Sequence, residues 1–152
     1  AGMVTTSDVG NLDDIHPTRK REVGERLARL ALARAYGIEG IAHSGPVYRR
    51  AVVEGNGVRI HFDHTDGGLR AGDGDLSGFE MSSQSQPSVF RSARARIEGR
   101  TVVVWNDDIR APAAVRYGWA GQIQNSSLFN GADLPAAPFR TDSSPGTERP
   151  RR

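Results

Sequence analysis

The sequence feature that most constrains the fold is a change of pattern at Gly40, after which short β-prone segments alternate with turn residues. Residues 55–57, Gly-Asn-Gly, separate two such segments, and Asn-Gly tolerates the positive φ values of tight hairpins. Every second residue from 58 to 62 is apolar, as in a half-buried strand. We expect strands at residues 47–54, 58–62, 78–82, 90–97, 101–105 and 114–119. Short strands separated by turns predict an antiparallel β-sandwich-like domain and not a repeated βαβ pattern.

The first 39 residues follow a different pattern, which predicts the order strand, loop, helix. A short β-prone run at residues 3–6 precedes a polar loop, and a helical pattern extends from Pro17 to Tyr36. Proline suits the first turn of a helix because its missing N–H would be unpaired there anyway. Gly37 is the predicted C-terminal cap. Spacings of three and four predict one apolar helical face, made of Val23, Leu27, Leu30, Ala31 and Ala35.

His16 lies at the predicted junction of loop and helix, two residues after Asp14 and three after Asp13. In an α/β domain, ligands bind beyond the carboxyl ends of the strands, where such a loop lies. A carboxylate beside an imidazole can fix its tautomer and stabilise the imidazolium that forms when it accepts a proton. A helix N-terminus favours the neutral, basic imidazole. Because Asp-x-x-His also arises by chance, these residues alone leave a structural or solvent-facing role open.

Matching segments extend along nearly the whole chain. They are Asp-Asp-Ile-His-Pro at 13–17, Lys20, residues 24–28, residues 36–37, residues 44–46, FDHTDGGL at 62–69, residues 78–80, VRYGW at 115–119 and LPAAPFRTD at 134–142. Together these segments resemble the carboxyl-terminal part of the sialate O-acetylesterase family. That family consists of carbohydrate esterases whose catalytic domain is of the SGNH-hydrolase type.

The resemblance implies that His16 is the catalytic histidine and that Asp13, at the Asp-x-x-His position, is its carboxylate partner, with Asp14 as the alternative. It implies an α+β chain in two parts. Residues 1–39 would be the end of an α/β SGNH-hydrolase domain, a strand-loop-helix remnant that carries the catalytic loop and last helix. Residues 40–142 would be the antiparallel β-sandwich-like domain.

The family's nucleophilic serine lies in a glycine-rich block far upstream of this region. No Gly-Asp-Ser, Gly-Gln-Ser-Asn or Gly-x-Ser-x-Gly string occurs in this chain. We therefore expect a carboxyl-terminal fragment of a serine-type carbohydrate acetylesterase that is inactive alone. The expected partners are an acetylated carbohydrate and the missing amino-terminal catalytic part, and no cofactor or metal is expected. The resemblance alone suggests a periplasmic or extracellular location.

A competing hypothesis is a non-enzymatic module, in which the β-sandwich-like domain binds a glycan or packs against a catalytic partner.

Other classes of protein fit the composition less well. The net charge is +2, and the basic residues, almost all arginine, are interleaved with acidic ones, so no field of one sign forms to attract nucleic acid. No apolar run has the ~20 residues that a membrane-spanning helix needs. The chain has no cysteine, which excludes disulfides and thiolate metal sites.

Two other polar groups invite a functional hypothesis. His61, Asp63 and His64 are candidate metal ligands, but alternation along a strand places His64 on the opposite face, so we interpret them as surface residues of a hairpin. His43 and Ser44 are a candidate base and nucleophile, but sequence neighbours rarely present both side chains to one reacting centre. We do not expect either group to be a site.

The aromatic residues are expected to be part of the core. Phe79, Trp105, Tyr117 and Trp119 would bury large apolar areas, and this interpretation is favoured over a sugar-stacking platform. Strand alternation places Tyr117 and Trp119 on one face. Apolar residues at 128, 129, 134 and 139 are expected to dock on the body. Residues 143–152 lack apolar content and are predicted to be a disordered tail.

Overall fold

The computed structural model describes residues 1–11, 13–119 and 127–142, so the predicted tail lies outside the described residues. The described elements are α1 (Lys20–Arg34), β1 (Val47–Glu54), β2 (Gly57–Asp63), β3 (Leu69–Ala71), β4 (Phe79–Ser83), β5 (Gln86–Glu98), β6 (Thr101–Trp105), β7 (Pro112–Tyr117), β8 (Leu128–Asn130) and β9 (Phe139–Arg140). Every strand expected after residue 40 is present; β1 and β6 have the predicted boundaries, and those of β2, β4, β5 and β7 are shifted by one to four residues. One helix beside a mostly β body is consistent with the α+β class.

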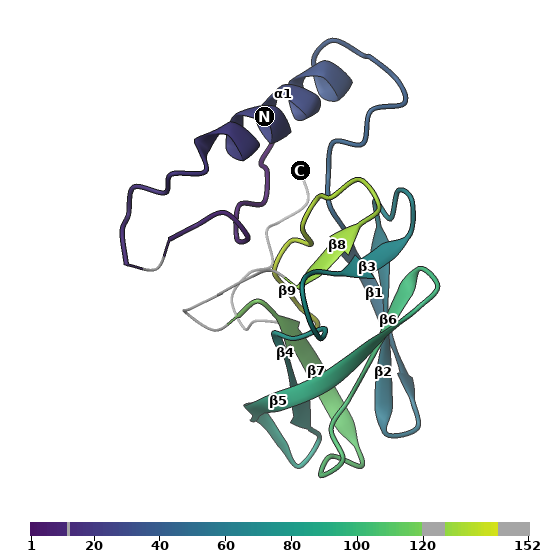
Figure 1. Ribbon diagram of the computed structural model, residues 1–152. Helices are drawn as coiled ribbons and strands as arrows, with labels where there is room; N and C mark the ends of the chain where they lie inside the picture. Colours follow the sequence, from purple (N-terminus) through teal and green to yellow (C-terminus); the bar gives the residue numbers. More distant parts are fainter. Residues whose placement is uncertain (12, 120–126, 143–152) are drawn as a thin grey trace.

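The strands form an antiparallel body, here called the β-body, as the sequence predicts. The main sheet has the order β1-β2-β6-β5-β4-β7-β9, and β3 pairs with β8 in a small second sheet. The long strand β5 belongs to two half-sheets, because its residues up to Ala93 pair with β4 and those from Arg94 pair with β6. Figure 1 shows β5 crossing the body diagonally. A strand that passes from one half-sheet to the other is a feature of sandwich-like packing.

The two edges of the main sheet approach each other, so the sheet is nearly closed. The Ala137 N–H donates to the Pro46 carbonyl at 3.0 Å, just before β1 and β9. Nearby, the rings of Tyr48 and Phe139 stack with centroids 5.1 Å apart. Gly45 is needed at this contact, because a Cβ there would lie 1.9 Å from the Pro135 carbonyl oxygen. Two of the segments that carry the family resemblance, 44–46 and 134–142, therefore meet in space.

The core lies inside the β-body and follows the alternation read from the sequence. Val58, Ile60 and Phe62 of β2 are buried, as predicted, and face Val102 and Val104 of β6 across the strand pair. The expected docking residues are buried as well, at positions 128, 129, 134 and 139. Half-burying each strand in this way removes one complete apolar face from water, which is the main favourable contribution to the fold.

The aromatic residues divide between core and surface. Phe79 and Tyr117 are in the core, as predicted, with ring centroids 4.6 Å apart. Trp119 does not share their face, because β7 ends at Tyr117 and Gly118 turns the chain with a φ of 63°. Its side chain remains 48% exposed, and the guanidinium groups of Arg116 and Arg140 lie 5.4 and 5.3 Å from its ring.

The amino-terminal region differs from the predicted strand-loop-helix order in two places. Residues 3–6 are not a strand, because they pair with no other strand and lie along the helix, where Arg26 donates to the Thr5 carbonyl at 2.8 Å. The helix begins at Lys20 and not after Pro17, so residues 17–19 remain in the loop. The helix ends at Arg34 with Ala35 as its C-cap, two residues before the predicted end at Tyr36, and Gly37 has a φ of 68° just beyond it.

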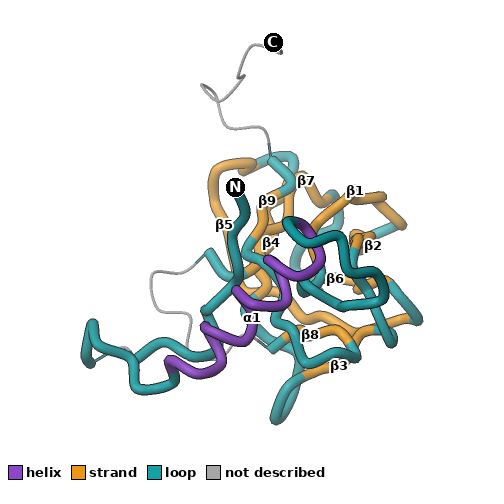
Figure 2. The backbone as a smooth tube through the Cα atoms, turned by 90° about the horizontal axis from the view of Figure 1, so that it is seen from above, coloured by secondary structure: helices purple, strands orange, loops and turns teal. Residues whose placement is uncertain are grey.

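The predicted apolar face of α1 is only partly buried, with Val23, Leu30 and Ala31 half-buried. Arg26 is the buried residue of this helix, whereas Leu27 is 48% exposed. Figure 2 shows α1 lying beside the β-body with the preceding loop extending away from it. Among the described residues, no helix has the length and apolar character that crossing a bilayer requires.

Asn130 holds three loops together: the one before β1, the one after β2 and the one after β8. Its Nδ2 donates to the carbonyls of Ser44 and His64, each at 3.0 Å. Its Oδ1 accepts from the N–H groups of Ala132 and Leu134 at 3.2 and 3.1 Å. The side chain is fully buried and uses both of its donors and both acceptor positions.

Replacing Asn130 with alanine should therefore lower the free energy of unfolding by at least ~2 kcal/mol, because buried backbone groups lose their partners. Urea unfolding followed by circular dichroism measures this change. Gln84→Ala, which removes an amide from an exposed turn, is the control and should leave the urea midpoint almost unchanged. A wild-type midpoint for Asn130→Ala would show that these four hydrogen bonds do not hold the loops together.

Candidate functional site

The loop that carries His16 is fastened to α1 by a buried ion pair. Arg26 donates from Nη1 and Nη2 to the two carboxylate oxygens of Asp8, each at 2.6 Å, and the two side chains are 9% and 10% exposed. Arg19, at the other end of the loop, donates from Nη1 to the Asp8 carbonyl at 3.3 Å. A two-pronged guanidinium contact fixes orientation as well as distance. Both ends of the loop are thus held at one point while its middle extends into solvent.

His16 contacts a carboxylate, and that carboxylate is Asp14. Its Nδ1 lies 3.0 Å from Asp14 Oδ1, and its backbone N–H donates to the same oxygen at 2.8 Å. The His16 and Asp14 side chains are 75% and 53% exposed. A carboxylate at Nδ1 favours the tautomer that carries its proton there, so Nε2 is available as the base. The pair has the chemistry of a proton shuttle and is exposed to solvent.

Asp13 lies on the same loop but is not the residue that contacts the ring. Its backbone N–H donates to Asn11 Oδ1 at 3.0 Å, which shapes the turn before His16. Its catalytic role therefore remains a prediction from the Asp-x-x-His spacing. The expected influence of the helix N-terminus is also reduced, because α1 begins four residues after His16 and helix-dipole effects fall off within the first turn.

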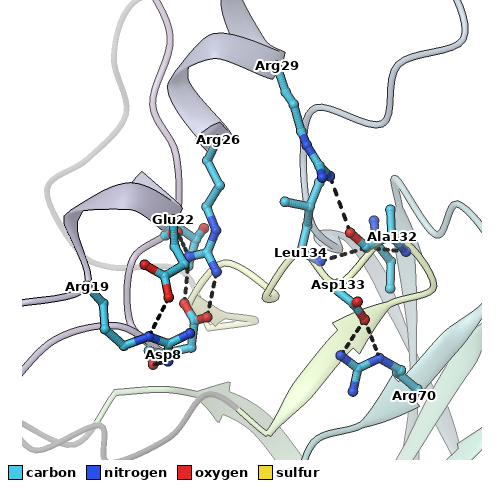
Figure 3. A network of polar contacts seen from close by, with 11 residues as sticks. Asp8, Arg19, Glu22, Arg26, Arg29, Arg70, Ala132, Asp133 and Leu134 are labelled. Carbon is cyan, nitrogen blue, oxygen red and sulfur yellow. Dashed lines mark hydrogen bonds and ion pairs between the residues drawn. The ribbon is translucent and has the colours of Figure 1, made fainter. Parts of the chain in front are cut away.

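A polar groove of about 670 Å³ runs between α1 and the loops of the small sheet. Its walls come from Asp8, from α1 and Arg19 just before it, and from the segments 70–77 and 127–134. Figure 3 shows that its arginines already have partners: Arg26 with Asp8, Arg19 with Glu22 at 2.7 Å and Arg70 with Asp133 at 2.6 Å. Arg29 reaches across the groove to the Ala132 carbonyl at 3.4 Å.

Sequence reasoning missed the polar groove, because its residues come from three distant segments that share no periodic or motif signal. The ion pair between Asp8 and Arg26 was likewise invisible, because Asp8 lies in the loop before α1 and a periodic pattern relates only residues of one element. His16 does not line the groove.

The other polar candidates do not form the sites that their residue types suggest. His43 accepts from Arg34 Nε at 3.2 Å and its Nδ1 lies 3.2 Å from the Ile41 carbonyl, whereas Ser44 donates to the Gly45 carbonyl at 2.9 Å. His43 and Ser44 are thus engaged separately. Within residues 1–11, 13–119 and 127–142, no group of three or more histidine and carboxylate side chains is placed to hold a metal ion.

This chain was compared with protein families, curated sequences and solved structures. No protein-family model matches this chain, and no curated protein sequence matches it significantly. Among solved structures, a carbohydrate acetylesterase from Xanthomonas citri is similar, with a TM-score of 0.82 and 42% sequence identity over 90% of this chain. The chain spans 31% of the length of that enzyme. The similarity supports the carbohydrate-esterase assignment at the level of class.

Proposed function

We propose that this chain is part of a carbohydrate acetylesterase and supplies the histidine and carboxylate of a Ser-His-Asp mechanism. The observation that carries the proposal is the 42% identity over 90% of the chain to the Xanthomonas citri carbohydrate acetylesterase. Because the chain spans 31% of that enzyme, the remaining catalytic groups would come from a segment that this chain does not contain.

In this mechanism, a serine outside this chain attacks the acetyl carbonyl of a sugar ester. His16 Nε2 accepts the serine proton and then donates it to the leaving sugar hydroxyl, which gives an acetyl-enzyme. Water activated by the same nitrogen releases acetate and restores the serine. The carboxylate at Nδ1 orients the ring and stabilises the imidazolium. The Asp-x-x-His spacing favours Asp13 for this role, and the 3.0 Å contact favours Asp14.

The exposed apolar side chains of the amino-terminal region support a partner surface at this end of the molecule. Met3, Ile15, Leu27, Tyr36 and Ile38 are all exposed. The proposed occupant is the rest of the catalytic domain, which would also supply the oxyanion donors. The substrate class is an acetylated carbohydrate, and sialic acid is the sugar that the family resemblance suggests.

Two protein samples test the proposal by their release of acetate from an acetylated oligosaccharide and from an aryl acetate. The first is this chain alone, which should have no measurable turnover, because an imidazole without a positioned nucleophile lacks most of the rate enhancement. The second is a chimera in which this chain replaces the corresponding segment of the Xanthomonas citri enzyme, and it should be active.

The controls separate the competing functions. A chimera that is monodisperse and folded by circular dichroism, yet inactive, would favour a non-enzymatic glycan-binding or packing module. Turnover by the isolated chain that disappears with Ser44→Ala would instead transfer catalysis to His43 and Ser44. Either result would contradict the proposed role of the chain.

A further inference from the structure

A cavity of about 420 Å³ opens at the end of the β1–β2 pair, beside the turn between β5 and β6. This size lies within the range of about 300–1,000 Å³ that is usual for small-molecule sites. We call it the basic cavity, and its charged and histidine side chains are Arg49, Arg50, His61, Asp63, His64 and Arg100. None of these residues lines the polar groove beside α1.

A β-bulge brings two consecutive arginines into this cavity. Tyr48 pairs with Phe62 and Arg50 pairs with His61, so Arg49 is an extra residue in β1. In a regular strand, neighbouring side chains point to opposite faces. The bulge changes that alternation, and both Arg49 and Arg50 line the cavity. Bulges that redirect side chains in this way are frequent next to functional sites.

The positive charge of the basic cavity is not neutralised by its own carboxylate. Arg49 and Asp63 form one long ion pair, with 3.6 Å between Nη1 and Oδ1. Arg50 contacts His61 at 3.5 Å, and Arg100 donates from Nε to the Thr65 hydroxyl at 2.7 Å. Within the part of the chain that the structure describes, no carboxylate lies within ion-pair distance of Arg50 or Arg100. Three guanidinium groups thus face one carboxylate, unlike the paired arginines of the polar groove.

The state of His61 agrees with an excess of positive charge. Burial lowers the pKa of this imidazole, and the charges of Arg50 and Arg59 lower it further. Glu54 acts in the opposite direction but does not reverse the shift. A negatively charged ligand would relieve this repulsion.

Contacts with neighbouring residues hold the walls of the basic cavity in place. His64 has a positive φ of 57°, and its carbonyl accepts from the buried amide of Asn130 at 3.0 Å. Its ring packs edge-on against His43 with centroids 5.3 Å apart. Thr65, which holds Arg100, is itself buried. Such a preorganised site would lose little conformational freedom when a ligand binds.

We propose that the basic cavity binds an oxyanion carried by a sugar, either a uronic-acid carboxylate or a sugar phosphate, with Arg50 and Arg100 as the charged contacts. The planar guanidinium group matches the geometry of both anions. The choice of a sugar rests on the proposed function, whereas binding of the anion itself does not. The cavity is separate from the loop of His16, so it would hold an acidic glycan without taking part in deacetylation.

Isothermal titration calorimetry on the full 152-residue chain tests the proposal, with ionic strength kept constant by sodium chloride. The probes are glucuronate, glucose 6-phosphate, inorganic phosphate and neutral glucose. We expect at least one of the two anionic sugars to bind more tightly than inorganic phosphate, and glucose not to bind. The preferred anionic sugar distinguishes a carboxylate from a phosphate ligand.

Variants locate the binding site. Arg50→Gln and Arg100→Gln should each weaken binding of the anionic sugar by about tenfold or more, since each removes a charge-assisted contact. Arg91→Gln, at an exposed arginine of β5, is the matched control and should not change the affinity. Circular dichroism checks that each variant is folded.

The proposal fails as a whole if no anion binds or if Arg91→Gln weakens binding as much as Arg50→Gln does. If inorganic phosphate binds but neither anionic sugar does, the cavity is an anion site and its assignment to a sugar ligand is wrong. That last result would also count against the carbohydrate assignment of this cavity without affecting the acetylesterase test, which measures acetate release.

Discussion

His16→Ala is expected to lower acetate release by the chimeric enzyme by on the order of 10³-fold or more, because the serine loses the base that accepts its proton. The side chain is exposed, so its removal should not unfold the protein. The measurement is kcat/KM on an acetylated oligosaccharide, at a protein concentration matched by circular dichroism. His43→Gln removes an imidazole from another loop and should keep nearly full activity. Wild-type activity in His16→Ala would disprove the catalytic assignment.

The two neighbouring aspartates are distinguished in the same assay. Asp14→Asn should lower activity by roughly 10²- to 10⁴-fold, because Asp14 is the carboxylate that contacts Nδ1 of His16 and the amide cannot stabilise an imidazolium. Asp13→Asn should be the milder change, since Asp13 contributes its backbone to the turn. The reverse ranking would assign the role to Asp13, as the Asp-x-x-His spacing predicts, and would mean that the loop rearranges in the complete enzyme.

Asp8→Asn or Arg26→Met should each destabilise the amino-terminal region by on the order of 3–5 kcal/mol, because each leaves the other group of a buried ion pair without a partner. The effect should also reach His16, whose loop is held at both ends near Asp8. Hydrogen exchange followed by mass spectrometry should show faster exchange across α1 and little change in β2 and β6.

The same helix provides a matched control for this prediction. Arg21 and Glu25 form an exposed pair one turn apart, with side chains 88% and 52% exposed. Exposed pairs of this kind contribute little to stability. Arg21→Met should therefore leave exchange across α1 almost unchanged. If Arg21→Met and Arg26→Met have equal effects, the buried pair is not what fastens the loop.

Local sequence patterns predicted the β-body well, because its signals are short-range. Alternation at 58–62 defined the buried face of β2, and Gly-Asn-Gly at 55–57 marked its hairpin. The same approach was wrong for Trp119, because Gly118 changes the chain direction within one residue and ends the alternation. It was also wrong for residues 3–6, because β propensity gives a strand only where a neighbouring strand provides hydrogen bonds.

The candidate site could be predicted only in part. His16 stands out because histidine, carboxylates and proline are adjacent in sequence, whereas the choice between Asp13 and Asp14 depends on how the loop folds. The first turn of α1 was misplaced because proline marks a permissible helix start and not an obligatory one. The basic cavity was not foreseen at all, since it requires a bulge at Arg49 and a residue from the distant β5–β6 turn.

The contact between the two sheet edges has a consequence for how the chain folds during synthesis. Pro46 and Tyr48 can make their contacts only after Ala137 and Phe139 have been synthesised, whereas the hairpin of β1 and β2 can form earlier. Contacts between such distant positions form slowly, because a long loop must close before they are made. β1 is nevertheless an edge strand of the main sheet, and Val52 and Val53 near its end remain exposed in the folded protein. The closing contact therefore covers only the start of β1, and the edge beside Val52 and Val53 is the part of the folded protein at which another copy could pair.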